Sequence, residues 1–441
     1  MSSIQPLRFL HTGDLHLDSP FEGLSTAGPP EVLAVLRSAT TEAWRNVVRI
    51  ALDERVDFVV VAGDVFEVAS PTLLGQTRFR DGLADLAAAG IGSYVVHGNH
   101  DPLDGRSWAP SLDFPDAAHR FGSAAGESVA VVRGGQEIAR IHGRSYPAAA
   151  VRENYAAGMR ADPSDAFSIG VLHTNVGDRP GHANYAPCSV EDLRASGMDY
   201  WALGHIHQPG QVLADPPAYY CGIPQGRDPG ELGVRGCYLV EVDAAGRVTP
   251  RLVATDVARW HPIDLSIVGL TDDEGLRRAC REALGTAMDG ADGRSLVVRI
   301  RLAGRGPLHG HLARPGYLDD LRQLLNEEAG IAAPFSWVES VRDATRPDVD
   351  LEARRGAPDF VGDFLRTAAA ARRSERTTDP DEHDRWMSTL RSTVAPLFDE
   401  SPRGRRLLVR ARPDDEALVG DLLDEAESLG IDLLLAAEEE R

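Results

Sequence analysis

Side chains that commonly bind metal ions gather in five short segments of this 441-residue chain, each directly after a run of apolar residues. A lone aspartate or histidine in such a position is usually a turn former or a core residue. Five segments in succession offer three oxygen and at least four nitrogen ligands, so they predict one shared metal site. Mixed carboxylate, amide and imidazole ligands suit manganese, iron or zinc better than calcium or magnesium. The predicted ligands are Asp14, His16, Asp64, Asn99, His173, His205 and His207.

The spacing within the segments supports a single site. One residue separates Asp14 from His16, and one separates His205 from His207. Alternate residues of an extended chain point the same way, so each pair can reach one cation. Asp64 follows a glycine that permits a sharp turn, and its carboxylate is placed to bridge two cations.

A further histidine, His100, stands beside Asn99 in a Gly-Asn-His-Asp run. The carboxylate of Asp101 is close enough in sequence to orient this imidazole, although an aspartate here is equally typical of a turn. His97, just before the run, is expected to be a strand-end residue rather than a ligand.

The elements that position these residues follow from the apolar runs. Strand-like runs alternate with helical patterns, which indicates an α/β sheet with helices on its faces. Because the polar residues of interest follow the strands, they are expected on loops at the strand ends, where open α/β sheets place their ligands. Strands are predicted at residues 7–12, 57–62, 92–96, 129–133, 137–142, 168–173, 200–203, 237–242 and 248–254, with helices at 31–54 and 72–89.

The pattern changes twice further along the chain. Residues 256–345 predict a small domain in which strands at 263–268 and 296–302 flank a helix at 272–287. Residues 346–441 are predicted to be a helical, partner-binding region. Its leucine stripe is read either as a docking face or as a face that packs on its own domain; the stripe comprises Leu418, Leu422, Leu429 and Leu433.

Composition limits the classes of function. The net charge of -21, from 46 basic residues that are all arginine against 67 acidic ones, argues against a broad surface for polyanions. Bound cations can reverse the local field, so nucleic acid is not excluded. The four cysteines form no Cys-x-x-Cys pair, which favours a reducing compartment. Without a signal peptide or an apolar run of ~20 residues, the chain is expected to be cytoplasmic and not membrane-bound.

The motifs in their order resemble the calcineurin-like metallophosphoesterase superfamily over about the first 255 residues. Within it, the chain is similar to bacterial DNA-repair exonucleases of the SbcD kind, and especially to the YhaO-type branch. It lacks the Gly-Asp-x-Val-Asp-Arg-Gly and Gly-Asn-His-Glu runs usual in protein Ser/Thr phosphatases. The resemblance rests on the runs from Asp14 to Phe21, Gly63 to Glu67, Gly98 to Asp101, His182 to Cys188 and Asp199 to His207.

This resemblance implies an α/β fold, a four-layer α-β-β-α sandwich over residues 1–255, with a small α+β capping domain over 256–345 and a C-terminal helical tail over 346–441. It also implies two divalent metal ions, with Mn²⁺ expected and Fe²⁺ or Zn²⁺ as alternatives. His100 is implied to be the catalytic histidine, which protonates the leaving oxygen or stabilises its charge, with Asp101 orienting it. One metal ion is implied to bind Asp14, His16, Asp64 and His207, and the other Asp64, Asn99, His173 and His205.

The expected function is a metal-dependent phosphodiesterase that acts in DNA repair as an exonuclease or endonuclease subunit. The implied partners are single- or double-stranded DNA ends, an SMC-like coiled-coil ATPase and a second copy of the chain. Loop arginines could supply phosphate contacts; they are Arg106, Arg144, Arg179 and Arg227. Two alternatives stay open: a phosphodiesterase or phosphatase of a small nucleotide, and a DNA-end-binding scaffold with little turnover.

Overall fold

The computed structural model describes residues 4–24, 28–67, 72–104, 113–162, 166–178, 183–330 and 332–375, and residues 385, 388, 426–427, 429–431, 433 and 434. The chain forms two compact units. The first consists of Met1–Pro262, Leu284–Arg299 and Asn326–Ser340, and the second of Ile263–Ala283, Ile300–Leu325 and Val341–Arg441.

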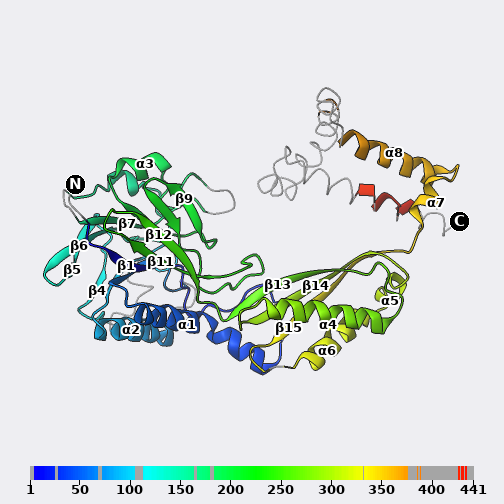
Figure 1. Ribbon diagram of the computed structural model, residues 1–441, viewed down its shortest axis with the longest axis horizontal. Coiled ribbons are helices and arrows are strands. Elements are labelled where there is room, and N and C mark those ends of the chain that lie inside the picture. The colour runs from blue at the N-terminus through cyan, green and yellow to red at the C-terminus, as the bar shows by residue number, and fades with distance from the viewer. Residues whose placement is uncertain are drawn as a thin grey trace. The chain divides into compact units, whose positions relative to one another are not determined.

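Two six-stranded sheets pack face to face in the first unit (Figure 1). In the first sheet, in spatial order, the strands are β12 (Val248–Ala254), β11 (Gly236–Val242), β1 (Leu7–Thr12), β2 (Phe58–Ala62), β3 (Gly92–Val96) and β4 (Ala118–Arg120). In the second they are β5 (Glu127–Arg133), β6 (Gln136–Gly143), β7 (Phe167–His173), β8 (Tyr200–Gly204), β10 (Pro217–Tyr220) and β9 (Gly210–Ala214).

The centre of the first sheet is apolar on both faces. Strand β2 reads Phe-Val-Val-Val-Ala and is buried throughout. Phe58 and Val60 face the second sheet, whereas Val59 and Val61 face the helices, as the two-residue period of a strand requires. Because β1, β2 and β3 run parallel, their carboxyl ends meet at one edge, and β6, β7 and β8 repeat this arrangement in the second sheet.

Helices cover the two outer faces and complete four layers. Figure 1 shows α1 (Pro30–Asp53) and α2 (Leu73–Ala88) along the first sheet, where Trp44 and Phe79 join its core. On the second sheet, α3 (Val190–Ala195) and the short 3-10 turn η1 (Ala156–Gly158) pack over Trp201. The fold is therefore the predicted α/β four-layer sandwich, and that prediction is confirmed.

A third sheet has the strand order β13-β14-β15. Its strands are β13 (Ala258–Ser266), β14 (Ser295–Arg305) and β15 (Ser336–Arg346). Within the first unit, Trp260 and Trp337 pack against Phe21, which follows the first ligand segment. The later helices are α4 (Asp273–Asp289), α5 (His309–Leu312), α6 (Tyr317–Ala329), α7 (Leu351–Arg355) and α8 (Phe360–Glu375).

The C-terminal leucine stripe is described only in part. Leu418 and Leu422 lie outside the described residues. Leu429 and Leu433 are 53% and 63% exposed, whereas Ile431 between them packs with Val361 and Leu365 of α8. No helix in the described parts of the chain is long and apolar enough to cross a membrane.

Gly82 of α2 sits where helix α1 comes close, because an added Cβ there would meet the indole of Trp44. Gly82→Ala is therefore expected to lower the free energy of unfolding by up to about 2 kcal/mol, because an overpacking cost of about 1–3 kcal/mol outweighs the roughly 1 kcal/mol gain in helix propensity. The matched control is Gly285→Ala in α4, where among the described residues no atom lies within 4 Å of the added Cβ. The control should gain about 1 kcal/mol in urea titrations; equal gains in both variants would contradict this packing.

Candidate metal centre

The five predicted ligand segments meet at the carboxyl ends of five strands. β1, β2 and β3 supply the first three segments, and β7 and β8 supply His173 and the histidine pair. Backbone hydrogen bonds tie the first two segments together: the Asp14 N–H donates to Gly63 O at 2.8 Å and the His16 N–H to Asp64 O at 3.1 Å. The sequence-predicted ligands are thus brought together in space.

Left-handed backbone marks several of these positions. Asp14, His16, Asp64 and His205 have φ values of 47°, 41°, 50° and 94°, which non-glycine residues seldom adopt. Such conformations cost about 1–3 kcal/mol each and cluster at functional sites. Gly63, at φ 97°, allows the turn before Asp64, and a Cβ there would come within 2.5 Å of His173 Nδ1.

In the first half of the site, hydrogen-bond acceptor atoms of two histidines and one aspartate lie close together. Nδ1 of His16 lies 3.1 Å from Glu67 Oε2, and Nδ1 of His207 lies 2.5 Å from Glu231 Oε1. With Nδ1–H donating to these carboxylates, each Nε2 is an acceptor, and the two Nε2 atoms face each other at 3.3 Å. Asp14 Oδ1 lies 4.0 Å from His207 Nε2. Two bare nitrogens beside a carboxylate fit a cation between them.

The second half repeats this chemistry. Nδ1 of His173 donates to Ala62 O at 3.0 Å, so Nε2 points at Asn99 Oδ1 and Asp64 Oδ2, 2.9 and 3.1 Å away. Nε2 of His205 lies 2.8 Å from Ala183 O, so Nδ1 is its nitrogen suited to a metal ion. Asp64 Oδ2 also lies 3.9 Å from His16 Nε2, so this carboxylate borders both halves. The residues present therefore fit a two-cation site that shares Asp64.

Burial makes the charges of the site strongly interdependent. Asp14 and Asp64 are 0% and 1% exposed. Burial raises the pKa of Asp14 to about 6, against the lowering effect of His173 and His207. Burial also opposes ionisation of Asp64, but His173 and His16 hold its pKa below the usual range. Burial would lower the pKa of His173, yet the charge of Asp64 raises it to about 9. A proton on His173 thus satisfies oxygens that a divalent cation would otherwise bind.

His100 lies at the more open rim of the centre, with its side chain 39% exposed. The backbone N–H of His100 donates to Asp64 Oδ1 at 2.9 Å, and the ring Nδ1 contacts Oε1 of Glu67. Burial lowers the pKa of His100, but the hydrogen bond to Glu67 and the negative charges of Asp64 and Glu67 together outweigh burial and raise this pKa. An imidazole held in this way can carry a proton to a bound ester.

Asp101 was expected to orient His100, but its carboxylate contacts other groups. Its two oxygens accept from the N–H groups of Gly98 and Val65, both at 2.8 Å, and from His97 Nδ1 at 3.0 Å. The Asp101 side chain therefore points back into the loop and stabilises it through these hydrogen bonds. The carboxylate that contacts the His100 ring is that of Glu67.

Two contributors to the site, Glu67 and Glu231, were left without a role by sequence reasoning, and Arg227, expected to contact phosphate, instead contacts Glu67. Glu67 and Glu231 hold the Nδ1 atoms of ligand histidines. Arg227 contacts Ser19 Oγ and lies 3.4 Å from Glu67 Oε2, with its side chain only 8% exposed. Glu67 stands three residues after Asp64, which was the available signal; Glu231 carries no local signal in the sequence.

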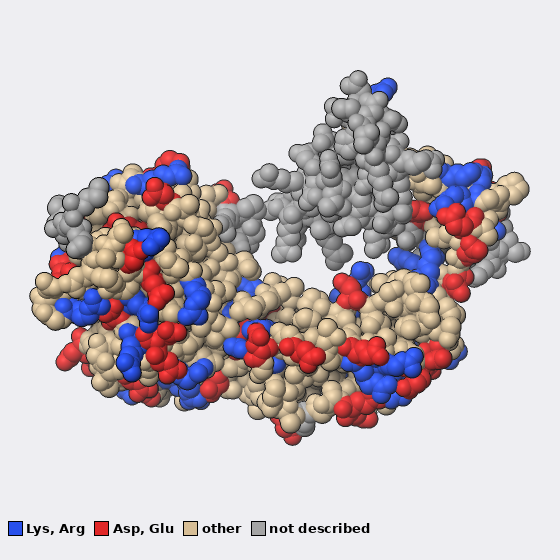
Figure 2. Space-filling model, in the orientation of Figure 1, with Lys and Arg blue, Asp and Glu red and all other residues tan. Residues whose placement is uncertain are grey.

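The other arginines expected near substrate are placed less directly. Arg144 stacks 3.8 Å over the ring of Tyr155 and pairs with Glu153 at 2.9 Å. Arg106 and Arg179 lie outside the described residues, as does His182. Figure 2 shows arginine and acidic side chains interspersed over the visible face of the first unit. On this face the arginines thus offer local contacts rather than a continuous basic surface.

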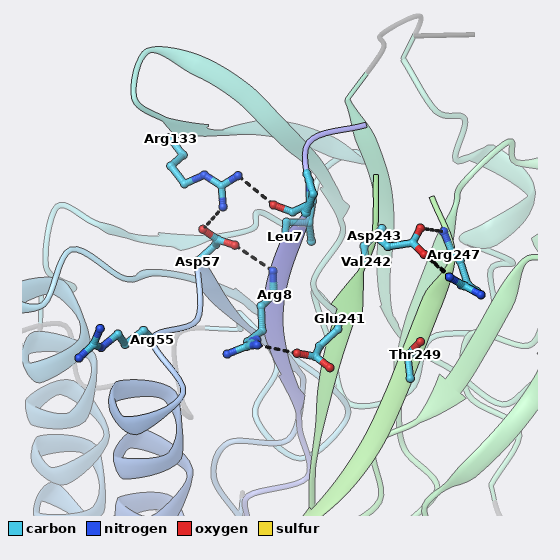
Figure 3. Close-up of a pocket in the computed structure, with 11 residues that line it drawn as sticks. Leu7, Arg8, Arg55, Asp57, Arg133, Glu241, Val242, Asp243, Arg247 and Thr249 are labelled. Atoms are coloured by element: carbon cyan, nitrogen blue, oxygen red, sulfur yellow. Dashed lines mark hydrogen bonds and ion pairs between the residues drawn. The ribbon is translucent and has the colours of Figure 1, made fainter. Parts of the chain in front are cut away.

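A cavity of about 610 Å³ in the first unit lies away from these ligands (Figure 3). It opens beside Leu7 and Arg8, at the amino end of β1, whereas Asp14 follows the carboxyl end. Most of its charged lining is paired: Arg8 Nη2 lies 2.6 Å from Glu241 and Arg133 Nη1 lies 2.8 Å from Asp57. The ligand chemistry, not this cavity, marks the functional site.

Comparison with known proteins agrees with the geometry. The sequence profile described as calcineurin-like phosphoesterase matches residues 7–209, and the profile of the metallophosphoesterase YhaO middle domain matches residues 260–346. A relative from Bacillus subtilis, named uncharacterized metallophosphoesterase YhaO, is 34% identical over 78% of this chain and 83% of its own length.

Two further relatives carry names from DNA metabolism. A subunit of the nuclease SbcCD from Bacillus subtilis is 28% identical over 49% of this chain and 61% of its own length. The DNA double-strand break repair protein Mre11 of Haloferax volcanii is 29% identical over 68% of this chain and 62% of its own. The chain therefore spans less than two thirds of these two proteins.

All seven predicted metal ligands fall within the matched phosphoesterase region, and the similarity to the YhaO relative extends over most of that protein. The chain belongs to the calcineurin-like metallophosphoesterases, a family of hydrolases with a dimetal centre, and to its YhaO branch.

Proposed function

We propose that this chain is a metal-dependent phosphodiesterase that cleaves DNA as a nuclease subunit in DNA repair. The observation that carries the proposal is the geometry of the centre: two groups of metal-ligand atoms converge and share Asp64, and His100 lies at their rim. The relatives named as a nuclease subunit and as a DNA double-strand break repair protein support DNA as the substrate.

The donor set favours two manganese ions, with iron or zinc as the alternatives. When bound, two divalent cations would activate water and neutralise phosphate oxygens. Asp64 would be shared between them, because its Oδ2 lies near Nε2 of both His16 and His173. Asp14, His16 and His207 would complete one ligand set, and Asn99, His173 and His205 the other.

His100 would act on the leaving group. Its Nδ1 is occupied by Glu67, so Nε2 is the nitrogen that can meet a bound ester. As water adds to phosphorus, the phosphorus–oxygen ester bond breaks and Nε2 gives its proton to the departing oxygen. A proton released by the added water then restores the imidazolium, which balances the step.

The rest of the chain is proposed to serve a polymeric substrate. We divide it into a nuclease domain over residues 1–255, a capping domain over 256–345 and a partner-binding region over 346–441. The exposed Leu429 and Leu433 offer an apolar contact for an SMC-like coiled-coil ATPase. Pairing of two copies of the chain is proposed as well.

The test is cleavage of end-labelled single- and double-stranded DNA with Mn²⁺, run beside Asp64→Ala and with bis(p-nitrophenyl) phosphate as a generic diester. We expect cleavage of DNA and of the diester by the wild-type protein and of neither by the variant. Diester hydrolysis without DNA cleavage would argue for a small nucleotide substrate or for a required ATPase partner. Hydrolysis of neither ester would reject the proposal.

Removal of His100 should separate metal binding from turnover. His100→Ala is expected to keep two bound metal ions, because its imidazole is not in either proposed ligand set. Cleavage of DNA should fall by about 10²–10⁴-fold, the usual contribution of a general acid. Metal analysis and single-turnover cleavage would check both parts; loss of both ions in this variant would contradict the assigned role.

Metal binding should release a proton from His173. Because the pKa of His173 is raised to about 9, the imidazole is protonated at pH 7.5 and must lose its proton to become a ligand. We expect release of close to one proton at pH 7.5 from this residue, about half a proton near pH 9, and little above about pH 10.

Calorimetric titration with Mn²⁺ in buffers of different ionisation enthalpy measures this release. His173→Asn is the control, since it removes the titrating group, and should release correspondingly less. Equal proton release by the wild-type protein and the control would show that His173 enters the site neutral.

A further inference from the structure

Two adjoining cavities lie in the first unit, at the end of the sheets away from the metal centre. Their volumes are about 610 and 340 Å³, and both are lined by Arg55, Asp57 and Arg133. They open at the amino ends of β1 and β2, whose carboxyl ends lead to Asp14 and Asp64. Because a strand of six residues spans about 20 Å, a small molecule bound in these cavities would not touch the metal ligands.

The larger cavity is lined by four arginines and three carboxylates. Figure 3 shows ion pairs for three of these arginines: Arg8 with Glu241, Arg133 with Asp57, and Arg247 with Asp243. The fourth is Arg55, and among the described residues no hydrogen bond or ion pair reaches its guanidinium. This exposed arginine, at the border of the two cavities, therefore has its charge available for a ligand.

The backbone conformation of Arg55 is unusual for an arginine. Helix α1 ends in a Schellman motif: the N–H of Arg55 donates to Leu52 O at 3.2 Å, and the N–H of Val56 to Ala51 O at 3.1 Å. This motif requires a left-handed residue at position 55, where Arg55 has a φ of 51°. Glycine adopts this conformation most easily and is the usual residue there. Since strained backbone tends to occur at functional positions, an arginine in place of glycine points to a role for its side chain.

The smaller cavity offers apolar walls next to this arginine. Its aliphatic lining comes from the ends of α1 and β3 and from the hairpin of β5 and β6, and includes Leu52, Val56, Ile91, Val131, Val132 and Ile138. Leu52 and Val132 are 36% and 61% exposed, so apolar surface is open to a ligand. Sites for small organic molecules combine such walls with a few polar groups. The two cavities together therefore suit a molecule with an apolar ring and an anionic group.

We propose that the two cavities form a second ligand site, which binds a nucleoside monophosphate. The phosphate would lie beside Arg55 and Arg133, because the planar guanidinium matches phosphate oxygens. The flat base would lie between Leu52 and Val132. Inorganic phosphate would leave the apolar walls in water, and an uncharged nucleoside would leave Arg55 without a partner.

This site goes beyond the proposed nuclease activity and does not depend on it, because none of its lining residues belongs to the metal centre. A nuclease that releases mononucleotides would, however, produce this ligand itself. The site would then bind the product of cleavage at a distance from the cleavage centre.

The experiment measures binding of deoxyadenosine 5′-monophosphate (dAMP) to the full-length, metal-free protein by isothermal titration calorimetry. Deoxyadenosine, ribose 5-phosphate and inorganic phosphate are titrated separately. Without metal ions, the carboxylates of the metal centre repel phosphate, so the titration reports on sites elsewhere. We expect one dAMP per chain and, for each of the other three compounds, a Kd at least about 10-fold higher, because each lacks part of the contacts.

Arg55→Gly removes the side chain without harming the fold. Because glycine suits the left-handed position of the Schellman motif, this variant should melt no lower than the wild-type protein. Its Kd for dAMP should rise about 10-fold or more, the expected effect of losing one charge-assisted contact. The matched control is Arg37→Gln, which removes an exposed arginine of the same helix outside both linings and should leave this Kd unchanged.

Methyl NMR locates the bound base. In protein labelled with ¹³C at the methyl groups of isoleucine, leucine and valine, the adenine ring should shift the signals of Leu52, Ile91 and Val132. Leu232 is the internal control, because it follows Glu231, which contacts the metal-centre histidine His207. It is 42% exposed and would report a nucleotide bound at the metal centre; its signal should stay in place.

The second site is rejected if dAMP does not bind, if inorganic phosphate binds as tightly as dAMP, or if Arg55→Gly keeps the wild-type affinity. Methyl shifts at Leu232 in place of Leu52 and Val132 would also overturn it, because the nucleotide would then lie at the metal centre. None of these measurements requires metal ions or cleavage. A protein that binds dAMP in this way but hydrolyses no ester would keep the second site and lose the proposed nuclease function, so the two failures are distinguishable.

Discussion

The structure depends on a group of hydrogen-bond acceptor atoms that are buried together at the metal centre with too few donors to pair them all. Asp14, Asp64, Asn99 and the facing histidine nitrogens come from two sheets, and neither sheet could complete the centre alone. Buried oxygen and nitrogen acceptors repel one another unless a cation lies between them. Metal binding is therefore expected to add stability to the junction of the two sheets as well as to make the chemistry possible.

Each ligand imidazole of the centre is held on the nitrogen that faces away from the metal position. Glu67, Glu231 and the carbonyl oxygens of Ala62 and Ala183 accept these hydrogen bonds. This outer ring sets the direction of these histidines before a cation arrives, and the tautomer of those that are neutral. Left-handed backbone at Asp14, Asp64 and His205 stores strain that this ring and the sheets must offset.

The parts of this fold that depend on local pattern were predictable. The apolar run of β2 predicts a buried strand, and the residue types after each strand predict metal ligands, because both signals lie in a few adjacent residues. β9 and β10 were missed because the run Asp215-Pro216-Pro217, whose last residue begins β10, is typical of a turn rather than of strand pairing. Glu231 could not be foreseen, since it reaches His207 only through the path of its loop. Asp101 misled because proximity in sequence to His100 is not contact between side chains.

Net charge sets the last constraint on how this centre meets a substrate. The chain carries a charge of -21, and the described arginines near the site are engaged, Arg227 by Glu67 and Arg144 by Glu153. A phosphodiester polymer is therefore repelled by the protein except where bound cations reverse the local field. Metal and substrate binding must then be coupled, each raising the affinity for the other. The long-range attraction that most DNA-binding proteins obtain from basic surfaces would have to come from a partner. Under the proposed function, an acidic hydrolase of this kind would gain its selectivity at the centre itself, through the few residues that would hold the metal ions and the leaving group.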